Sequence, residues 1–401
     1  MDIISDRLKR IKSSPSGAAR AIIAELREQG RSVIDLTVGE PDFPTPEHIR
    51  RAAHEAAERG ETRYTGVQGT VALRKAIREQ FLRDYGLDYP IADISVGNGA
   101  KQVIFNGLAA TINAGDEVII PAPFWVSYPD MVLLFGGKPV CLQATPESAY
   151  KLTAEALEAA ITPRTKWLLL NSPCNPTGAL YTHDELRALT DVLVRHPHVW
   201  LMTDDIYAYL NFTDARTVHP LEVAPELRSR TLMVNGVSKA YAMTGWRIGY
   251  GAGPSALITA MATLQSQCTS GASSVSQAAA LEALTGPQEC VGQFREIFKA
   301  RRDAAVAGLS KVRGLDVIVP EGAFYVYPTC AALLGKKTPD GTRIDTDVEL
   351  VDYFLREAGV AMINGTAYGA PGSFRVSYAN SLENITQACE AMQAAAARLT
   401  D

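Results

Sequence analysis

One lysine and one arginine stand where they could hold a charged ligand. Lys239 comes four residues after the end of the apolar segment 231–235, where an ammonium group would be partly desolvated. Burial lowers the pKa of a lysine, and the neutral amine is a nucleophile that can form an imine with a carbonyl cofactor. An alternative is a lysine paired with an acid at the sheet edge. Arg247, close behind in the chain, favours the cofactor interpretation because its planar fork of donors matches a phosphate.

Other polar or aromatic residues follow further strand-like segments. They are Gly99, Ala100 and Lys101 after 94–97, Trp125 after 117–121, Asn175 after 167–171, and Asp204 and Tyr207 after 199–203. In a parallel sheet ligands bind at the carboxyl ends of the strands, so these residues are expected at one rim. The glycine-rich turn 97–99 opens a helix and exposes backbone N–H groups to an anion, although an ordinary tight turn has the same sequence character.

The elements that must position these residues alternate along the chain. Strands are predicted at 94–97, 117–121, 167–171, 199–203, 231–235 and 247–251, with helices between them such as 100–112, 183–195 and 257–268. This alternation predicts an α/β fold with a mostly parallel sheet covered on both faces.

A second, smaller α+β domain is predicted after residue 286. Its elements are a long charged helix (291–309), short strands at 317–319, 323–327 and 374–377, and a helix near 347–358. We therefore predict an N-terminal arm (1–14), a large domain (47–285), and a small domain made of 15–46 and 286–401.

Length, charge and cysteine usage narrow the class of protein. The 401 residues exceed one ordinary core, which agrees with two domains. A net charge of -5 argues against nucleic acid as a partner, and the lack of a long apolar run argues against a membrane span. Six scattered cysteines form neither a zinc nor a disulfide pattern, so we expect no metal and a cytoplasmic location.

Four segments together resemble one known family. Residues 238–250 (SKAYAMTGWRIGY) are similar to the lysine motif of the class I/II pyridoxal-phosphate-dependent aminotransferases. The segments 39–43 (GEPDF), 175–178 (NPTG) and 204–207 (DDIY) match the same family in the same order. The resemblance extends from about residue 8 to 399 and is closest to the bacterial aspartate aminotransferase branch, which includes aspartate/prephenate aminotransferases. It implies the fold of PLP-dependent transferases of fold type I.

The resemblance also implies roles at the cofactor. Lys239 would hold pyridoxal 5'-phosphate as a Schiff base and then act as acid and base, while Asp204 faces the pyridine nitrogen. Asn175 and Tyr207 would bond the phenolic oxygen, and Trp125 would stack on the ring. A helix N-cap is the alternative for Asp204, although its spacing before Tyr207 favours the cofactor role, and from the residues alone Trp125 is equally a core aromatic.

The cofactor phosphate has its own implied ligands. They are the turn at Gly99, the backbone N–H groups of Ala100 and Lys101, the guanidinium of Arg247, and the hydroxyl of Ser238. Family members often carry a hydroxyl three residues before the lysine, where this chain has Gly236. Tyr64 matches a tyrosine that reaches the phosphate of the neighbouring subunit, which implies a homodimer with shared sites; alternatively it is a turn tyrosine packed in its own chain.

Substrate residues are implied in the same way. Arg375 would clamp the α-carboxylate, with the backbone of Gly39 closing over it and Asn175 and Trp125 nearby. Lys101 would meet a second carboxylate. Lys12 resembles a lysine at the site entrance in the aspartate/prephenate members, although a solvated arm residue explains it as well. These residues predict transfer of an amino group from L-aspartate to 2-oxoglutarate, with prephenate or glutamate as further partners.

Other functions are weighed against this one. The same fold and cofactor serve aromatic amino acid aminotransferases and carbon–sulfur lyases. Aminotransferase-like transcription regulators carry an added DNA-binding domain, for which the roughly 30 residues before the first strand leave no room. A dinucleotide-binding dehydrogenase is disfavoured because Gln102 stands where its glycine fingerprint needs a small residue.

Overall fold

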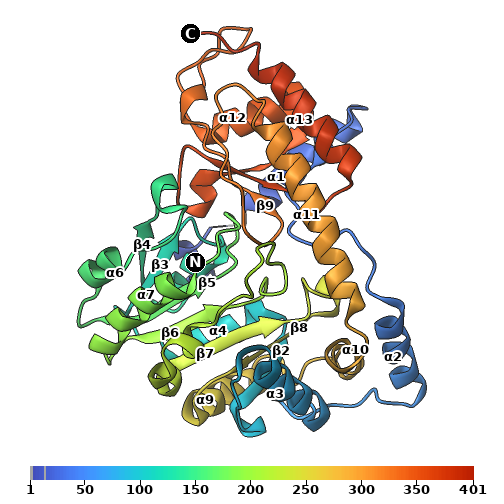
Figure 1. Cartoon of the computed structure of the whole chain (residues 1–401), viewed down its shortest axis with the longest axis vertical. Coiled ribbons are helices and arrows are strands. Elements are labelled where there is room, and N and C mark those ends of the chain that lie inside the picture. Colours follow the sequence, from blue (N-terminus) through green and yellow to red (C-terminus); the bar gives the residue numbers. More distant parts are fainter. Residues whose placement is uncertain (1–2, 13–14) are drawn as a thin grey trace.

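A seven-stranded sheet forms the centre of the larger part of the molecule (Figure 1). The computed structural model describes residues 3–12 and 15–401. The strand order is β2-β8-β7-β6-β5-β3-β4. Their bounds are β2 (Ile94–Asn98), β3 (Glu117–Ala122), β4 (Lys138–Gln143), β5 (Thr165–Asn171), β6 (Trp200–Asp204), β7 (Thr231–Gly236) and β8 (Ile248–Ala252). Only β8 runs antiparallel to its neighbours in this sheet, so the predicted α/β fold with a mostly parallel sheet is confirmed.

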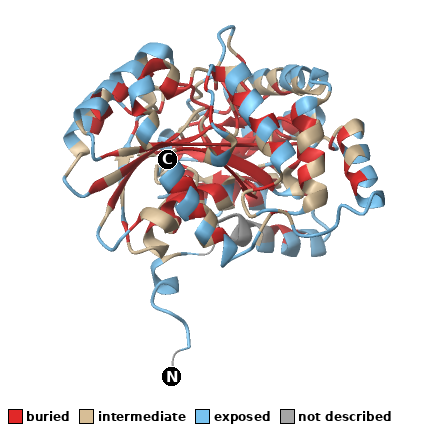
Figure 2. Ribbon diagram, turned by 90° about the horizontal axis from the view of Figure 1, so that it is seen from below, coloured by how far each residue is buried: buried red, intermediate tan, exposed pale blue. Residues whose placement is uncertain are grey.

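Helices cover both faces of this sheet, and the strands are buried between them (Figure 2). Helices α4 (Ala100–Thr111), α5 (Ser127–Leu134) and α9 (Ser255–Ser266) share one core with alternate strand residues such as Met202 and Val234. The opposite core contains Leu201 and Met233. This alternation is the two-residue period of a strand that is covered on both sides.

The opposite core is closed by a second set of helices. They are α2 (Glu47–Glu58), α3 (Val71–Tyr85), α6 (Ala154–Ala160), α7 (His183–Arg195), α8 (Pro220–Val223) and α10 (Ser274–Thr285). The start of α7 illustrates how the sequence sets such a boundary. Thr182 accepts a hydrogen bond from the Glu185 N–H, and the Glu185 side chain bonds back to the Thr182 backbone, which forms a capping box.

The C-terminal part carries a three-stranded antiparallel sheet in the order β11-β12-β9. Its elements are α11 (Glu289–Leu309), β9 (Tyr325–Val326), α12 (Asp347–Tyr353) with a π turn over Phe354–Ala358, β10 (Val360–Ala361), β11 (Ile363–Asn364), β12 (Phe374–Ser377) and α13 (Leu382–Ala396). In Figure 1 it stands above the large sheet, with α11 running between the two parts.

The N-terminal segment joins this C-terminal part. After α1 (Pro15–Glu28), strand β1 (Ile34–Asp35) pairs in parallel with β10. Ile23 and Leu26 of α1 share a small core with Leu355 and Ala361. These contacts agree with a smaller α+β unit completed by the N-terminus, while the exact domain boundaries stay a prediction. Of the predicted arm 1–14, residues 1, 2, 13 and 14 lie outside the described part.

One predicted strand is absent from the structure, and one strand of the large sheet was not predicted. Residues 317–319 form no strand: only the preceding Asp316 makes an isolated bridge, to Thr329, and Val319 is exposed. Strand β4 was missed because it lies at the edge of the sheet, is only half-buried, and has a short apolar run, 139–142, that begins with a proline.

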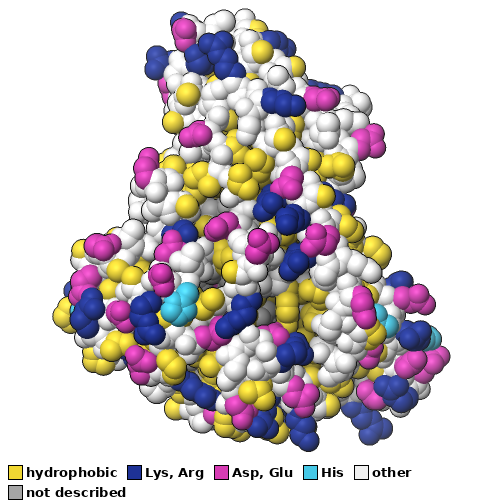
Figure 3. All heavy atoms as spheres, in the orientation of Figure 1, with side chains coloured by type: hydrophobic (Ala, Val, Ile, Leu, Met, Phe, Trp, Pro, Cys, Tyr) yellow, Lys and Arg dark blue, Asp and Glu magenta, His cyan; other side chains and the backbone are white. Residues whose placement is uncertain are grey.

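The surface of the described residues shows no large segregation of charge on the face drawn in Figure 3. Acidic and basic side chains are interspersed there, in line with the small net charge of -5. Among the described residues, no helix combines the length and apolar character that a membrane crossing requires.

Candidate active site

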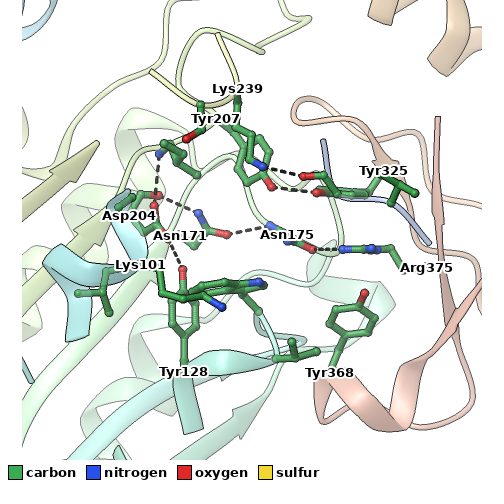
Figure 4. A pocket seen from close by; sticks show the side chains of 18 of the residues that line it. Lys101, Tyr128, Asn171, Asn175, Asp204, Tyr207, Lys239, Tyr325, Tyr368 and Arg375 are labelled. Carbon is green, nitrogen blue, oxygen red and sulfur yellow. Dashed lines mark hydrogen bonds between the residues drawn. The ribbon is translucent and has the colours of Figure 1, made fainter. Parts of the chain in front are cut away.

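A cavity of about 250 Å³ lies at the carboxyl ends of the parallel strands (Figure 4). The predicted residues that line it are Gly39, Ala100, Lys101, Trp125, Asn175, Asp204, Tyr207, Ser238, Lys239, Arg247 and Arg375. The expectation that the loops after separate strands meet at one rim is therefore confirmed. Residues from the C-terminal part close the cavity from the other side.

Lys239 presents its amine inside this cavity. Its Nζ donates a hydrogen bond to the carbonyl oxygen of Gly39 at 2.6 Å. Burial lowers the pKa of Lys239 to about 8; nearby Glu40 raises it, and the positive charges of Arg247 and Arg375 lower it further. The neutral, nucleophilic form of this lysine is therefore more accessible near neutral pH than that of a solvated lysine.

Asp204 ends β6 and is held from two directions. The hydroxyl of Tyr128 donates to its carboxylate at 2.5 Å, and the side-chain amide of Asn171 donates to its backbone carbonyl at 2.7 Å. Burial raises the pKa of Asp204 to about 6, and the hydrogen bond from Tyr128 opposes that rise. A carboxylate of this kind can share a proton with a basic ring nitrogen.

A chain of polar contacts runs from the backbone carbonyl of Asp204, through Asn171, to Arg375. The backbone N–H of Asn175 donates to the side-chain oxygen of Asn171 at 2.8 Å. The side-chain oxygen of Asn175 in turn accepts from Nη1 of Arg375 at 3.0 Å, and Nη2 of Arg375 donates to the carbonyl of Thr37 at 2.5 Å. Nε of Arg375 is buried without a partner. The guanidinium is thus pre-positioned by neutral acceptors and keeps donors available for an anion.

The opposite end of the cavity is suited to a phosphate. Helix α4 begins at Ala100, directly after Gly99, which has φ 84°. A Cβ on Gly99 would lie 2.5 Å from Nη2 of Arg247, so only glycine lets the helix N-terminus and this guanidinium approach each other. Exposed N–H groups at a helix start beside an arginine form an anion site. Ser238 is buried nearby at the cavity wall.

Lys101 lies beside this end with its charge toward an aromatic ring. Its Nζ is 4.6 Å from the centre of the Trp125 ring and donates to Oγ of Ser127 at 3.3 Å. Partial burial and the charge of Arg247 lower its pKa. Among the described residues this ammonium forms no ion pair with a carboxylate, which leaves it available to a negatively charged ligand group.

Three tyrosines of the cavity were not found from the sequence. Tyr128 follows Trp125 in a helix and looks like a core aromatic. Tyr325 and Tyr368 belong to the C-terminal part, and nothing in their spacing relates them to the lysine motif. The hydroxyl of Tyr325 lies 2.9 Å from that of Tyr207, and burial raises the pKa of both phenols, so both remain hydrogen-bonding groups rather than charges.

Gly99 directly precedes the cavity-lining Ala100 but does not line the cavity itself, and two further predicted residues lie away from the cavity. Tyr64 is 98% exposed. Lys12 is also exposed, and its contact with Asp130 of α5 is through the Lys12 backbone. Within one chain the structure brings neither residue to the other predicted ligands. Their assignment depends on a second subunit and stays a prediction.

The residues present fit pyridoxal phosphate. An amine with a lowered pKa, a carboxylate with a raised pKa and an anion site at a helix N-terminus border the same cavity. A family profile described as aminotransferase class I and II matches residues 31–392.

The chain belongs to the class I and II aminotransferase family. Its relatives extend over the whole length of the chain. A probable aspartate/prephenate aminotransferase of Rhizobium leguminosarum is 53% identical over 393 residues, covering 98% of each chain. An aspartate/prephenate aminotransferase of Cereibacter sphaeroides is 52% identical over 400 residues, covering 100% of each.

Solved structures agree with this assignment. The aspartate aminotransferase of Rhizobium meliloti has a TM-score of 0.98 and 51% identity, with 100% of both chains covered. The aspartate aminotransferase of Thermus thermophilus, solved with maleate, has a TM-score of 0.91 and 41% identity, covering 98% of this chain and 100% of that chain. The predicted family, fold type and enzyme class are confirmed: the chain is an aminotransferase.

Proposed function

We propose that this aminotransferase binds pyridoxal 5'-phosphate through Lys239 and transfers the amino group of L-aspartate to 2-oxoglutarate. The observation that carries the proposal is the buried amine of Lys239, with a pKa lowered to about 8, in one cavity with Asp204, Arg247 and Arg375. Few other functions require a nucleophilic amine, a proton-sharing carboxylate and two separate arginines around one small space.

Each residue has a task in this proposal. Pyridoxal phosphate, when bound, supplies an aldehyde and a ring that accepts electrons. Arg247 and the N-terminus of α4 would hold its phosphate, with Ser238 as the nearby hydroxyl, and Asp204 would keep the ring nitrogen protonated. Asn175 and Tyr207 would bond the phenolic oxygen, and Trp125 would pack against the ring.

The substrate is positioned by the residues at the other end. Arg375 binds the α-carboxylate, and Gly39 closes over it, so that the α-hydrogen faces Lys239. Lys239 then accepts that proton and returns it at the end of the transfer, a task for which an amine with a lowered pKa is suited. Exclusion of water by the C-terminal part favours both steps.

The preference for a dicarboxylate rests on a second cation. Lys101 places an ammonium at the cavity wall next to Trp125, away from the donors of Arg375. A substrate with two carboxylates satisfies both cations, and one with an apolar side chain leaves Lys101 unpaired. The names of the full-length relatives, and the maleate in the Thermus thermophilus structure, support this preference. The names of the relatives also support prephenate as a partner, and glutamate has the same two charges.

The first experiment locates the cofactor. Purified protein treated with pyridoxal phosphate and borohydride is digested and mapped, and the adduct is expected on Lys239. An adduct on another lysine, or none, contradicts the proposal. A panel of substrates then tests specificity. Aspartate, glutamate and the amino acid formed from prephenate are compared as amino donors with tyrosine and cystathionine, and prephenate is tested as an amino acceptor. Faster turnover of tyrosine, or cleavage of cystathionine, would favour an aromatic aminotransferase or a carbon–sulfur lyase instead.

The role of Lys101 is tested by Lys101→Ala. Loss of a distal ion pair in a closed site costs roughly 2–5 kcal/mol, so kcat/KM for aspartate is expected to fall by about 30-fold or more. Alanine as substrate serves as the internal control and should change little. Equal losses for both amino acids would remove Lys101 from the specificity argument.

We also propose a cytoplasmic homodimer in which Tyr64 reaches the phosphate site of the neighbouring subunit and Lys12 reaches its entrance. The exposure of both side chains supports this, because neither has a buried place in its own chain. Tyr64→Ala should weaken cofactor binding. Mixed dimers of Tyr64→Ala and Lys239→Ala should regain activity at limiting cofactor, since one of their two sites is intact. No regain would mean that the sites are not shared.

A further inference from the structure

Tyr368 is a buried tyrosine whose hydroxyl has no hydrogen-bond partner. It ends the 3-10 turn Gly365–Tyr368 shortly before β12, is 1% exposed, and lines the cavity. Figure 4 shows its ring on the side of the cavity that carries Arg375, with the hydroxyl directed toward that residue. Buried polar groups in folded proteins are almost always paired, so an unpaired phenol at a ligand cavity requires an explanation.

The ring is held in place from behind, so it cannot turn to find another partner. The backbone carbonyl of Tyr368 accepts from the N–H of Phe124 at 3.1 Å. The next residue, Gly369, has φ 73°, and a Cβ there would lie 2.5 Å from the Phe124 ring. The Tyr327 ring packs edge-on against Tyr368, with the ring centres 6.0 Å apart. Packing therefore fixes the direction of the phenol.

The neighbouring guanidinium of Arg375 also has a buried donor without a hydrogen-bond partner. The Arg375 carbon Cζ lies 5.3 Å from the centre of the Tyr368 ring and 4.4 Å from that of Tyr325. Nε of Arg375 has no partner, as the Tyr368 hydroxyl has none. By contrast, the hydroxyl of Tyr325 pairs with Tyr207, and that of Tyr327 donates to the carbonyl of Ala370 at 3.1 Å. Two unpaired donors thus stand side by side at one end of the cavity.

We propose that the Tyr368 hydroxyl donates a hydrogen bond to the same substrate carboxylate that Arg375 binds, and that Tyr368 is therefore a specificity-determining residue of the amino-acid site. This inference rests on the proposed function, because it takes Arg375 to be the carboxylate ligand. A neutral phenol and a guanidinium together offer more donors than one carboxylate oxygen needs, so both oxygens are served. Burial raises the pKa of Tyr368, so the hydroxyl keeps its proton and remains a donor.

The consequence is selection for the carboxylate itself. An amine that lacks this group leaves the Tyr368 hydroxyl and Nε of Arg375 unpaired in a water-poor site, and sites built around hydrogen-bonding groups reject such analogues strongly. The distal end of the substrate is served by Lys101, which contacts Ser127 and Trp125 rather than Tyr368. Tyr368 should therefore act on all amino-acid substrates alike.

The test is Tyr368→Phe, which removes a single oxygen atom, studied in the cofactor-loaded protein. We expect kcat/KM to fall by roughly 10- to 100-fold for aspartate and for alanine, the usual loss for a hydrogen bond to a charged group. The affinity for maleate, which cannot react, should fall by a similar factor. The thermal midpoint of the ligand-free variant should be unchanged or higher, because an unpaired buried hydroxyl has been removed.

Tyr327→Phe is the matched control. It removes the hydroxyl of the adjacent ring, which donates a hydrogen bond to the backbone carbonyl of Ala370. The loss of that bond should lower stability with little change in kcat/KM. Three results would overturn the inference: unchanged kinetics in Tyr368→Phe, a loss confined to aspartate, or a loss of stability with no loss of maleate affinity. A wild type that turns over no amino acid would instead contradict the proposed function, so the two failures are distinguishable.

Discussion

Asp204 and Asp205 are adjacent in the sequence and both are buried, yet they lie in different environments on the two faces of the sheet. Asp204 borders the cavity and accepts the hydroxyl of Tyr128 from α5. Asp205 faces the opposite core, where its carboxylate accepts from Oγ1 of Thr203 at 2.8 Å and lies 3.4 Å from Nε2 of His219. Successive side chains of a strand point to opposite faces, so one residue of the pair reaches a ligand and the other reaches the core.

His219 explains how the second carboxylate is stabilised without a ligand. Its Nδ1 accepts the backbone N–H of Leu221 at the start of α8. The proton of the neutral ring must then be on Nε2, which faces Thr203 and Asp205. The Asp205 carboxylate thus contacts protein groups of the core, while Asp204 shares a cavity with Lys239 and Arg375. A satisfied buried acid contributes to the fold, and an acid beside a cavity contributes to chemistry.

The largest effect expected on the cavity side is that of Lys239→Ala. Loss of the amine removes both covalent attachment of the cofactor and the acid–base group, so kcat should fall by at least roughly a thousandfold. Turnover and the visible absorbance of the purified protein measure this. Undiminished turnover would show that another group carries the proton.

The comparison of the two carboxylates is tested directly by Asp204→Asn and Asp205→Asn. We expect Asp204→Asn to lower kcat by roughly 100-fold or more, the usual loss of a preorganised charge in a site, with a small change in stability. Asp205→Asn should leave kcat within about threefold but destabilise the protein by about 1–3 kcal/mol, because it disturbs the hydrogen bonds of Thr203 and His219. Steady-state kinetics and urea unfolding separate the two outcomes, and equal kinetic losses would contradict the comparison.

The pH dependence of unfolding gives a third test in the ligand-free protein. The pKa of Lys239 is lowered from 10.5 to about 8, so its burial opposes folding below pH 8 and this penalty disappears toward pH 10.5. The pKa of Asp204 is raised from 3.8 to about 6, so its contribution to stability falls as pH rises through that interval. Each of these two shifts changes the free energy of unfolding by on the order of 3 kcal/mol across its pH interval. Lys239→Met should therefore have a larger free energy of unfolding than the wild type at pH 7 and the same free energy near pH 10.5. If the two plots of this free energy against pH run parallel, burial of the Lys239 charge does not destabilise the protein.

The smallest effect expected is that of Tyr128→Phe. The hydrogen bond from Tyr128 lowers the pKa of Asp204, so its loss should raise that pKa and move the acid side of the pH–rate profile upward, with kcat at neutral pH reduced about tenfold or less. Thr203→Val removes the corresponding donor to Asp205 and is the matched control. A profile that moves equally in both variants would show that the two faces are not independent.

Much of the cavity was predictable because it follows from strand ends. Apolar runs located the parallel strands other than the edge strand β4 to within a few residues, and the loop after each one had to emerge at the same rim. Lys239, Asp204 and Asn175 meet for this reason alone. Two of the three tyrosines that sequence reasoning missed, Tyr325 and Tyr368, come from short strands and turns of the C-terminal part, whose local sequence carries no such positional rule.

The amino-acid sequence by itself determined the class of this protein: the alternation of elements, the lysine after its strand and the arginine behind it specify a parallel sheet with an anion-binding rim. Tertiary structure alone decided that Tyr325 and Tyr368 border the cavity, and that the Asn175 side chain bonds Arg375 directly, 200 residues away in the chain. The physical reason is that periodicity and turn chemistry act over a few residues. The direction of a buried polar group depends on partners that only the packed fold brings into contact.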